Sequence, residues 1–416
     1  MGVAILTLGM ASCDRDVYDE DKYIEIIKYL SPVDSVDQRH TWSLTENHTY
    51  RFHAETGSDI EIVRVFTENP LTSNAAEMMG SAYINKGGSA VISVVVPSIL
   101  TTLYAALVDK NGNYYVTSFS TSSIEVYISE GATMGRPTGS LIPQTFTYLF
   151  EENIPEAGDY DYNDLVLRIS QQRTGKKEIT INVTIAAIGG DYHMAGGIRL
   201  VGYRFEDIDS VKTTTGESFN DGVPTGSLYM FDKTDMLLEA RNKQAVINLF
   251  VDAHWAMAFN AVVDYGLFQR KKYNVSTSTG DNYQLRATRT LSYVVYFKSE
   301  TGLDDFSLDS LDPFIITSYS GGNWETHTDN YRDAQVFYEY KLSSKYKDLP
   351  WALRVPMRDF AYPLEGVQIG FKKKTAEGTT ALFGAYMTAG HSFGEWAEDY
   401  TKCLDWYLYP LSSYVW

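Results

Sequence analysis

Residues 150–167 read FEENIPEAGDYDYNDLVL and combine six carboxylates, without a basic residue, directly before an apolar run. Taken as extended chain, alternate positions from Asp159 project to one side, and that side continues as Leu165 and Leu167. Buried carboxylates without a partner are too costly to leave uncompensated, whereas Ca²⁺ takes six to eight oxygen ligands. The sequence therefore predicts a calcium site in this turn, with the ligands Glu151, Glu152, Asp159, Asp161, Asn163 and Asp164.

An EF-hand loop does not explain this motif, although its spacing begins in the same way. The sixth position is Asp164 rather than Gly, and the twelfth is Ser170 rather than Glu. Other ligands must then come from nearby, and Glu151 and Glu152 end the preceding strand. A solvated acidic turn between two strands remains the alternative.

Composition indicates a folded, mostly β protein. The 416 residues are 44% hydrophobic and 14% aromatic, with 31 tyrosines, while long helical patterns are scarce. We expect two antiparallel, jelly-roll-like β-sandwich domains with few short helices. The formal net charge of -18 disfavours nucleic acid as a partner and suits cations or an extracellular surface.

Residues 41–125 predict an N-terminal β-sandwich. Strand patterns cover residues 48–53, 60–66, 90–96, 103–108 and 114–119, and Asn111-Gly112 between the last two signals a hairpin. A region rich in Gly and Pro, residues 121–144, is the candidate domain boundary. Residues 143–416 then form a larger β domain, with strands predicted at residues 145–150, 165–170, 178–188, 244–251, 283–297, 334–340 and 366–371 and helical segments at 381–387 and 393–407.

Residues 1–13 resemble a bacterial lipoprotein signal peptide. An apolar segment too short to cross a bilayer as a helix ends in small residues before Cys13, although a basic n-region is missing and Met10 replaces the common Leu. We expect an acylated Cys13 and attachment to the outer membrane through lipid chains. Residues 14–40 follow as an acidic tether and short helix, resembling a surface-export signal. A chance apolar N-terminus and a plain charged linker are the alternatives.

Several motifs together resemble the LruC-type domain, found in surface lipoproteins of Bacteroides-type bacteria. The acidic motif of residues 150–166 is followed by GGDYHMAGGIRL at 189–200, NLFVDAH at 248–254, LPWALRVP at 349–356, YPLE at 362–365, FGEWA at 393–397 and DWY at 405–407. The resemblance covers roughly residues 143–410, and the loop at 322–327 departs from it. It implies a β-sandwich, a secreted or surface location and a calcium site, but no known activity.

Catalytic motifs are weak in this sequence. Asp252 and His254 could pair at a strand end, but no nucleophile motif accompanies them, which favours a hydrogen-bonded structural pair. Glu395 and Asp399, four residues apart, fit a solvated helix surface better than a glycosidase acid pair. The scattered histidines disfavour zinc, and the Gly189-Gly190 run favours turns or bulges.

The sequence thus predicts a non-enzymatic, lipid-anchored and cell-surface-exposed protein. Its larger β domain would be stabilised by structural Ca²⁺, and its role would be binding or adhesion to a glycan or protein. A surface hydrolase acting on carbohydrate and a fimbria-related structural component are the alternatives.

Overall fold

The computed structural model describes residues 35–129, 131–155, 158–223, 235–258, 271–278, 282–319, 322–339, 349–374 and 377–416. The expected signal peptide with Cys13, the tether up to residue 34 and its helix lie outside the described residues. Within them the chain is mostly β, with several mostly antiparallel sheets and short helices, which confirms the predicted fold class. None of the described helices has the length and apolar character needed to cross a membrane.

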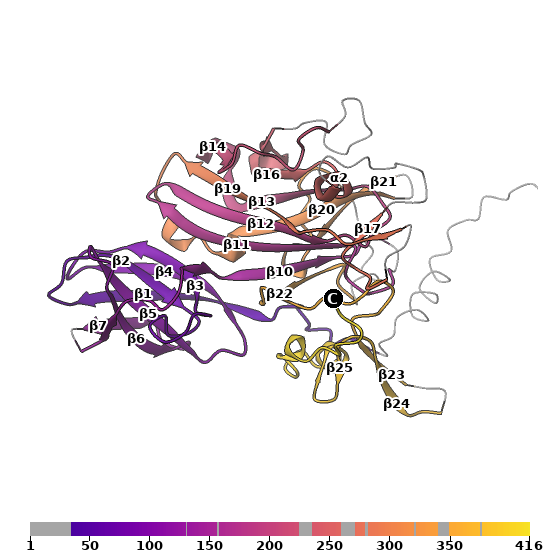
Figure 1. Ribbon diagram of the computed structural model, residues 1–416, viewed down its shortest axis with the longest axis horizontal. Helices are drawn as coiled ribbons and strands as arrows, with labels where there is room; N and C mark the ends of the chain where they lie inside the picture. The colour runs from indigo at the N-terminus through magenta and orange to yellow at the C-terminus, as the bar shows by residue number, and fades with distance from the viewer. Residues whose placement is uncertain are drawn as a thin grey trace, which may run out of the picture.

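The N-terminal residues form a sandwich of two sheets, seen in indigo and violet in Figure 1. One sheet has the order β4-β1-β7 and the other β8-β6-β5-β2-β3-β9. Buried side chains of both sheets, such as Phe52, Ile92 and Leu103, share one apolar core. The strands are β1 (Thr45–Glu55), β2 (Ile60–Phe66), β3 (Glu77–Tyr83), β4 (Ser89–Pro97), β5 (Thr102–Asp109), β6 (Tyr114–Ser120), β7 (Glu125–Ser129), β8 (Thr133–Gly135) and β9 (Ile142–Pro143).

Two local features of this sandwich were read from the sequence. The predicted hairpin joins β5 to β6, with Gly112 at a φ of 78° and the Asp109 carboxylate accepting from the amides of Asn111 and Asn113. The region of residues 121–144, in contrast, is more than a connection. It supplies β7, which pairs parallel to β1, and also β8 and β9, which are only three and two residues long.

The larger sandwich packs a six-stranded sheet, β14-β19-β12-β11-β10-β22, against a five-stranded sheet, β15-β16-β13-β20-β21. Leu167 and Ile181 of the first sheet share a core with Ile198, Ile247 and Ile315 of the second. The strands are β10 (Thr145–Phe150), β11 (Leu165–Gly175), β12 (Glu178–Ala187), β13 (Met194–Arg204), β14 (Ile208–Thr213), β15 (Leu237–Glu239), β16 (Gln244–Phe250), β19 (Arg289–Phe297), β20 (Leu311–Tyr319), β21 (Gly322–His327) and β22 (Ala352–Val355).

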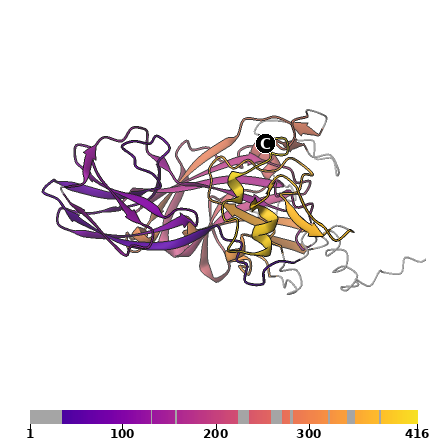
Figure 2. The ribbon, with the colours of Figure 1, turned by 90° about the horizontal axis from the view of Figure 1, so that it is seen from below.

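The C-terminal segment covers the outer face of the six-stranded sheet, as Figure 2 shows in yellow. Phe393, Trp396 and Trp406 pack there with Leu149 and Val166. Because β10 is covered on both faces, all of its residues are buried. The remaining elements are β17 (Lys272–Tyr273), β18 (Tyr283–Gln284), β23 (Phe371–Lys374), β24 (Thr380–Phe383), β25 (Met387–Thr388), β26 (His391–Ser392), α2 (Ala253–Ala258), α3 (Phe393–Glu398) and the 3-10 turns η1 (Phe205–Asp207), η2 (Arg241–Lys243), η3 (Leu303–Asp305), η4 (Leu308–Ser310), η5 (Asp329–Tyr331) and η7 (Trp406–Leu408).

Some predicted elements near the C-terminus are wrong. The segment 381–387 belongs to the hairpin of β24 and to β25, not to a helix, and the helix predicted at 393–407 is only α3 followed by η7. Asp399 adopts an extended conformation and Cys403 has a φ of 48°, so the helix cannot continue. Residues 334–339 form no strand, and of residues 366–371 only Phe371 enters one.

Candidate metal centre

The acidic turn connects the ends of two paired strands. Phe150 of β10 lies opposite Leu165 of β11, and residues 151–164 cross the end of the sheet between them. The extended conformation expected from Asp159 onward is wrong, because Tyr160 and Tyr162 have positive φ values of 60° and 54°. Both tyrosine rings are buried in the apolar cluster below the C-terminal segment. Tertiary packing of these rings, rather than strand alternation, therefore sets the direction of the carboxylates.

Three of the six predicted ligands come together. Oxygen atoms of Glu151, Asp159 and Asp161 all lie within 4.8 Å of one another. Glu151 is 1% exposed, and its Oε1 accepts from the Tyr162 amide at 2.6 Å. Its Oε2 has no hydrogen-bond partner among the described residues. A buried oxygen left unpaired beside two more carboxylates is the arrangement that a bound cation would satisfy.

Backbone groups fix this cluster from two sides. Asp161 accepts from the Gly366 amide at 2.8 Å through Oδ2 and from the Asn163 amide at 3.1 Å through Oδ1. Gly158 lets the chain approach Glu151 closely, since a Cβ at this position would lie 1.8 Å from Glu151 Oε2. The turn is thus shaped around the unpaired oxygen and has no space there for a side chain.

The predicted ligands Glu152 and Asp164 have other contacts. The carboxylate of Glu152 accepts from the amides of Asp191 at 2.6 Å and Tyr192 at 2.9 Å, and Asp164 Oδ2 accepts from the Glu152 amide at 2.7 Å. These bonds fasten the loop before β13 to the turn. Neither residue belongs to the group of three.

Asn163 takes an intermediate position. Its Nδ2 donates to the Pro363 carbonyl at 3.1 Å, while its buried Oδ1 lacks a partner among the described residues. Glu365 Oε2 is likewise buried without one. A Cβ on Gly189 would lie 1.8 Å from the Asn163 oxygen and 2.8 Å from the Glu365 oxygen, so both oxygens occupy the space that this glycine leaves.

The electrostatics of the turn resist ionisation. Burial, aided by neighbouring carboxylates, raises the pKa values of Glu151, Asp161 and Asp164 well above their usual range. Burial also raises the pKa of Glu152 to about 7. A bound divalent cation would reverse this preference, because it stabilises the ionised carboxylates.

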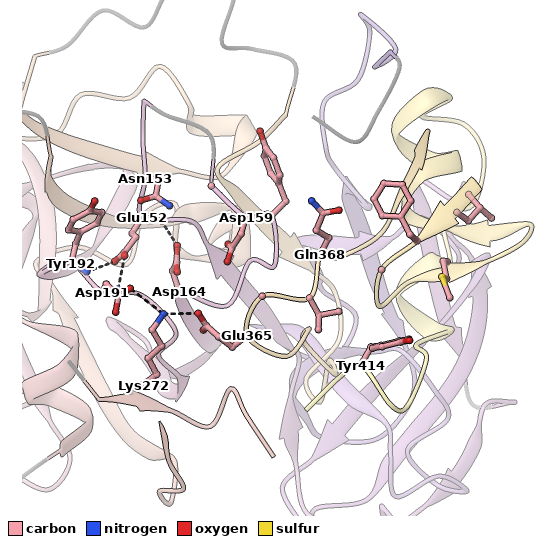
Figure 3. A pocket seen from close by; sticks show the side chains of 18 residues that line it. Glu152, Asn153, Asp159, Asp164, Asp191, Tyr192, Lys272, Glu365, Gln368 and Tyr414 are labelled. Carbon is pink, nitrogen blue, oxygen red and sulfur yellow. Dashed lines mark hydrogen bonds and ion pairs between the residues drawn. The ribbon is translucent and has the colours of Figure 1, made fainter. Parts of the chain in front are cut away.

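A cavity of about 1130 Å³ opens beside the cluster, between the acidic turn and the C-terminal segment (Figure 3). Lys272 is the one basic side chain among its described lining residues. Its Nζ donates to Glu365 Oε1 at 2.6 Å and lies 3.3 Å from Asp191 Oδ2. Burial opposes the charge of Lys272, but the contact with Glu365 outweighs it and raises the Lys272 pKa. The acidic lining residues are Glu152, Asp159, Asp164, Asp191 and Glu365.

Sequence reasoning did not identify Lys272, Asp191 or Glu365 as site residues. Asp191 and Glu365 lie in the segments 189–200 and 362–365, which carried the family resemblance without an assigned role. Lys272 belongs to no motif, and only the tertiary fold brings it to the acidic turn.

The other sequence candidates lie outside the cavity lining. Asp252 Oδ2 contacts His193 Nδ1 at 2.5 Å, whereas His254 Nδ1 is 4.0 Å from Asp252 Oδ1. Asp252 is therefore closer to His193 than to His254, its predicted partner. His254 Nε2 contacts the Gly190 carbonyl at 3.0 Å. Glu395 accepts from Ser392 at the start of α3, and so serves that helix end.

Comparison with known proteins gives two matches. Residues 177–372 match a family model described as a domain of unknown function, DUF4842. A crystal structure of a putative lipoprotein from Bacteroides ovatus is 13% identical, with a TM-score of 0.47, over 86% of this chain and 99% of that chain. No curated protein matches the sequence. Residues 177–372, from just before β12 to the start of β23, are thus similar to a family without an assigned function.

Proposed function

We propose that this protein is a non-enzymatic surface lipoprotein whose larger β domain is stabilised by Ca²⁺ held by Glu151, Asp159 and Asp161. The observation that carries the proposal is the unpartnered Oε2 of Glu151, which is buried and lies in one group with the other two carboxylates. The ion would join the end of β10, the acidic turn and, through Asp161, the segment at Gly366.

The donor set favours calcium over other common metals. All three groups are carboxylates, the hard oxygen ligands that Ca²⁺ prefers, whereas zinc sites draw on cysteine and histidine. The role we assign is structural, because Asp161 also accepts a hydrogen bond from the Gly366 amide and so ties the acidic turn to a segment distant in sequence. The resemblance of the acidic motif to LruC-type domains also implies a calcium site here.

The anchoring part of the proposal rests on the N-terminal sequence. The apolar segment before Cys13 supplies the expected acylation site, and the acidic residues after it suit export to the outer surface of the outer membrane. At this location we assign the protein a role in binding or adhesion to a glycan or protein. Replacing Cys13 with Ala should abolish incorporation of radiolabelled palmitate and release the protein from the membrane fraction, and undiminished labelling would refute this anchor.

Calorimetric titration of chelator-treated protein tests the metal site. We expect saturable Ca²⁺ binding in the wild type and strong weakening in Glu151→Gln, which keeps the side-chain size but removes the charge. Glu239→Gln, on the exposed face of β15, is the matched control and should bind as the wild type does. Equal affinity in all three proteins would refute the site.

A surface hydrolase is the second candidate, because the cavity brings carboxylates and aromatic residues together as a glycan-cleaving enzyme would require. Against it, Glu152 and Asp164 accept backbone hydrogen bonds and Glu365 pairs with Lys272. Incubation with polysaccharides labelled at the reducing end distinguishes a hydrolase from a binding protein, since a binding protein releases no shorter labelled fragments.

A further inference from the structure

Asp159 connects the proposed cation site to the cavity. Glu151 and Asp161 are each 1% exposed and do not line the cavity, whereas Asp159 is exposed and does. A cation among the three carboxylates would therefore have protein behind it and the cavity in front. One oxygen of Glu151 and both of Asp161 already accept backbone hydrogen bonds. Since Ca²⁺ takes six to eight oxygens, positions on the cavity side remain for water or for a ligand.

The charge of the cavity wall restricts the kind of ligand. Asp191 and Asp164 lie on the same side as Asp159, and Lys272 is already paired with Asp191 and Glu365 (Figure 3). An anionic ligand would be repelled by these groups. A neutral ligand with hydroxyl groups would instead donate hydrogen bonds to the carboxylates, and its oxygens could coordinate the cation.

The facing side of the cavity is less polar. Leu382, Phe383 and Met387 line it, together with Gln368 and Tyr414, which Figure 3 labels on this side; Tyr414 is 43% exposed. Aromatic rings opposite a row of hydrogen-bond acceptors suit a molecule with one apolar and one hydroxylated face. At about 1130 Å³ the cavity exceeds the usual size of a small-molecule pocket, which leaves room for more than one sugar ring.

We propose that the cavity binds a neutral saccharide, two neighbouring hydroxyls of which complete the coordination of the cation while a ring face packs on Phe383 and Tyr414. This inference rests on the proposed function, since it needs the cation held by Glu151, Asp159 and Asp161. It adds the class of ligand and the residues of the protein that contact this ligand.

Terbium luminescence tests the two claims separately. Tb³⁺ replaces Ca²⁺, the nearby Tyr160 and Tyr162 sensitise its emission, and lifetimes in H₂O and D₂O give the number of coordinated waters. We expect sensitised emission that Ca²⁺ competes away, with at least two coordinated waters. Absence of such emission would refute the cation site itself. Emission with no more than one coordinated water would refute only the opening to the cavity.

The saccharide is then added as the methyl glycosides of mannose, galactose, fucose and glucose, each at about 100 mM. At least one should lower the water number by about two, as two hydroxyls replace two waters. Phe383→Ala should raise the half-effective concentration by about two- to tenfold, the range expected for one stacking contact. Tyr409→Ala, exposed outside the cavity, is the control. If no glycoside changes the water number, or if Phe383→Ala binds as the control does, the saccharide proposal is wrong.

Discussion

The substitution Asp161→Asn should change stability in opposite directions with and without calcium. Without the ion, the carboxyl of Asp161 has a pKa raised by burial and by the charges of Asp159 and Glu365. The amide removes this charge but keeps only one oxygen for the amides of Gly366 and Asn163. The lost hydrogen bond costs about 1 kcal/mol, which removal of a buried like charge offsets. We expect the variant to be at least as stable as the wild type in EDTA at neutral pH.

With calcium bound, the wild type should be more stable than Asp161→Asn. At a free concentration one hundred times the Kd, bound Ca²⁺ stabilises the wild type by about 2.7 kcal/mol, or roughly 5–10 °C in Tm for a domain of this size. A tenfold loss of affinity in Asp161→Asn would remove about 1.4 kcal/mol of that gain. Differential scanning calorimetry of both proteins in EDTA and in calcium measures the difference.

The matched control is Asp209→Asn, which removes the same charge from an exposed residue of β14 and should follow the wild type in both buffers. If Asp161→Asn lowers the Tm by the same amount in EDTA and in calcium, the residue has only a packing role. The reasoning from a buried, cation-seeking carboxylate would then fail.

Three further predictions concern Glu152, Gly189 and the buried His327. Burial raises the pKa of Glu152 from 4.5 to about 7. Metal-free protein should therefore lose up to roughly 3 kcal/mol of unfolding free energy as pH rises from about 4.5 through 7. Urea unfolding measures this free energy at each pH, and a value that does not change with pH would contradict the prediction. Gly189→Ala should destabilise by about 1–3 kcal/mol, because its Cβ would lie 1.8 Å from Asn163 Oδ1. Gly131→Ala, whose Cβ would make only an ordinary contact with Ser129 Oγ at 3.6 Å, should not. The Asp312 carboxylate outweighs burial and raises the pKa of His327 to about 9. The contribution of this pair to the free energy of unfolding should therefore be complete below pH 6.5 and vanish as pH rises through 9. His327→Gln should lose about 3–5 kcal/mol at pH 7, and its unfolding free energy should show no such decrease with pH.

Strand prediction from the sequence succeeded where one face of a strand is buried and failed where packing overrides the pattern. β2 and β12 alternate between buried and less buried positions over much of their length. β13 was missed because Gly196 and Gly197 are poor strand formers. Their role appears only in the fold, where the Phe250 ring lies 2.5 Å from the Cβ that Gly196 lacks.

In the candidate site, too, some residues could be predicted from the sequence and others could not. Glu151, Asp159 and Asp161 are close in sequence, so their crowding could be read directly, although the backbone conformation that brings them together could not. Glu365 and Lys272 reach the turn only through the pairing of distant segments. No local spacing encodes that proximity, so sequence reasoning from residues 150–167 alone could not include them.

Anomalous diffraction data from crystals grown with calcium test most directly whether Glu151, Asp159 and Asp161 hold Ca²⁺. The account predicts an anomalous peak bounded by Glu151 Oε2, Asp159 and Asp161, with oxygen distances of about 2.3–2.6 Å and further coordination on the cavity side. A map without that peak, in which Glu151 Oε2 receives a hydrogen bond from water or protein instead, would contradict it.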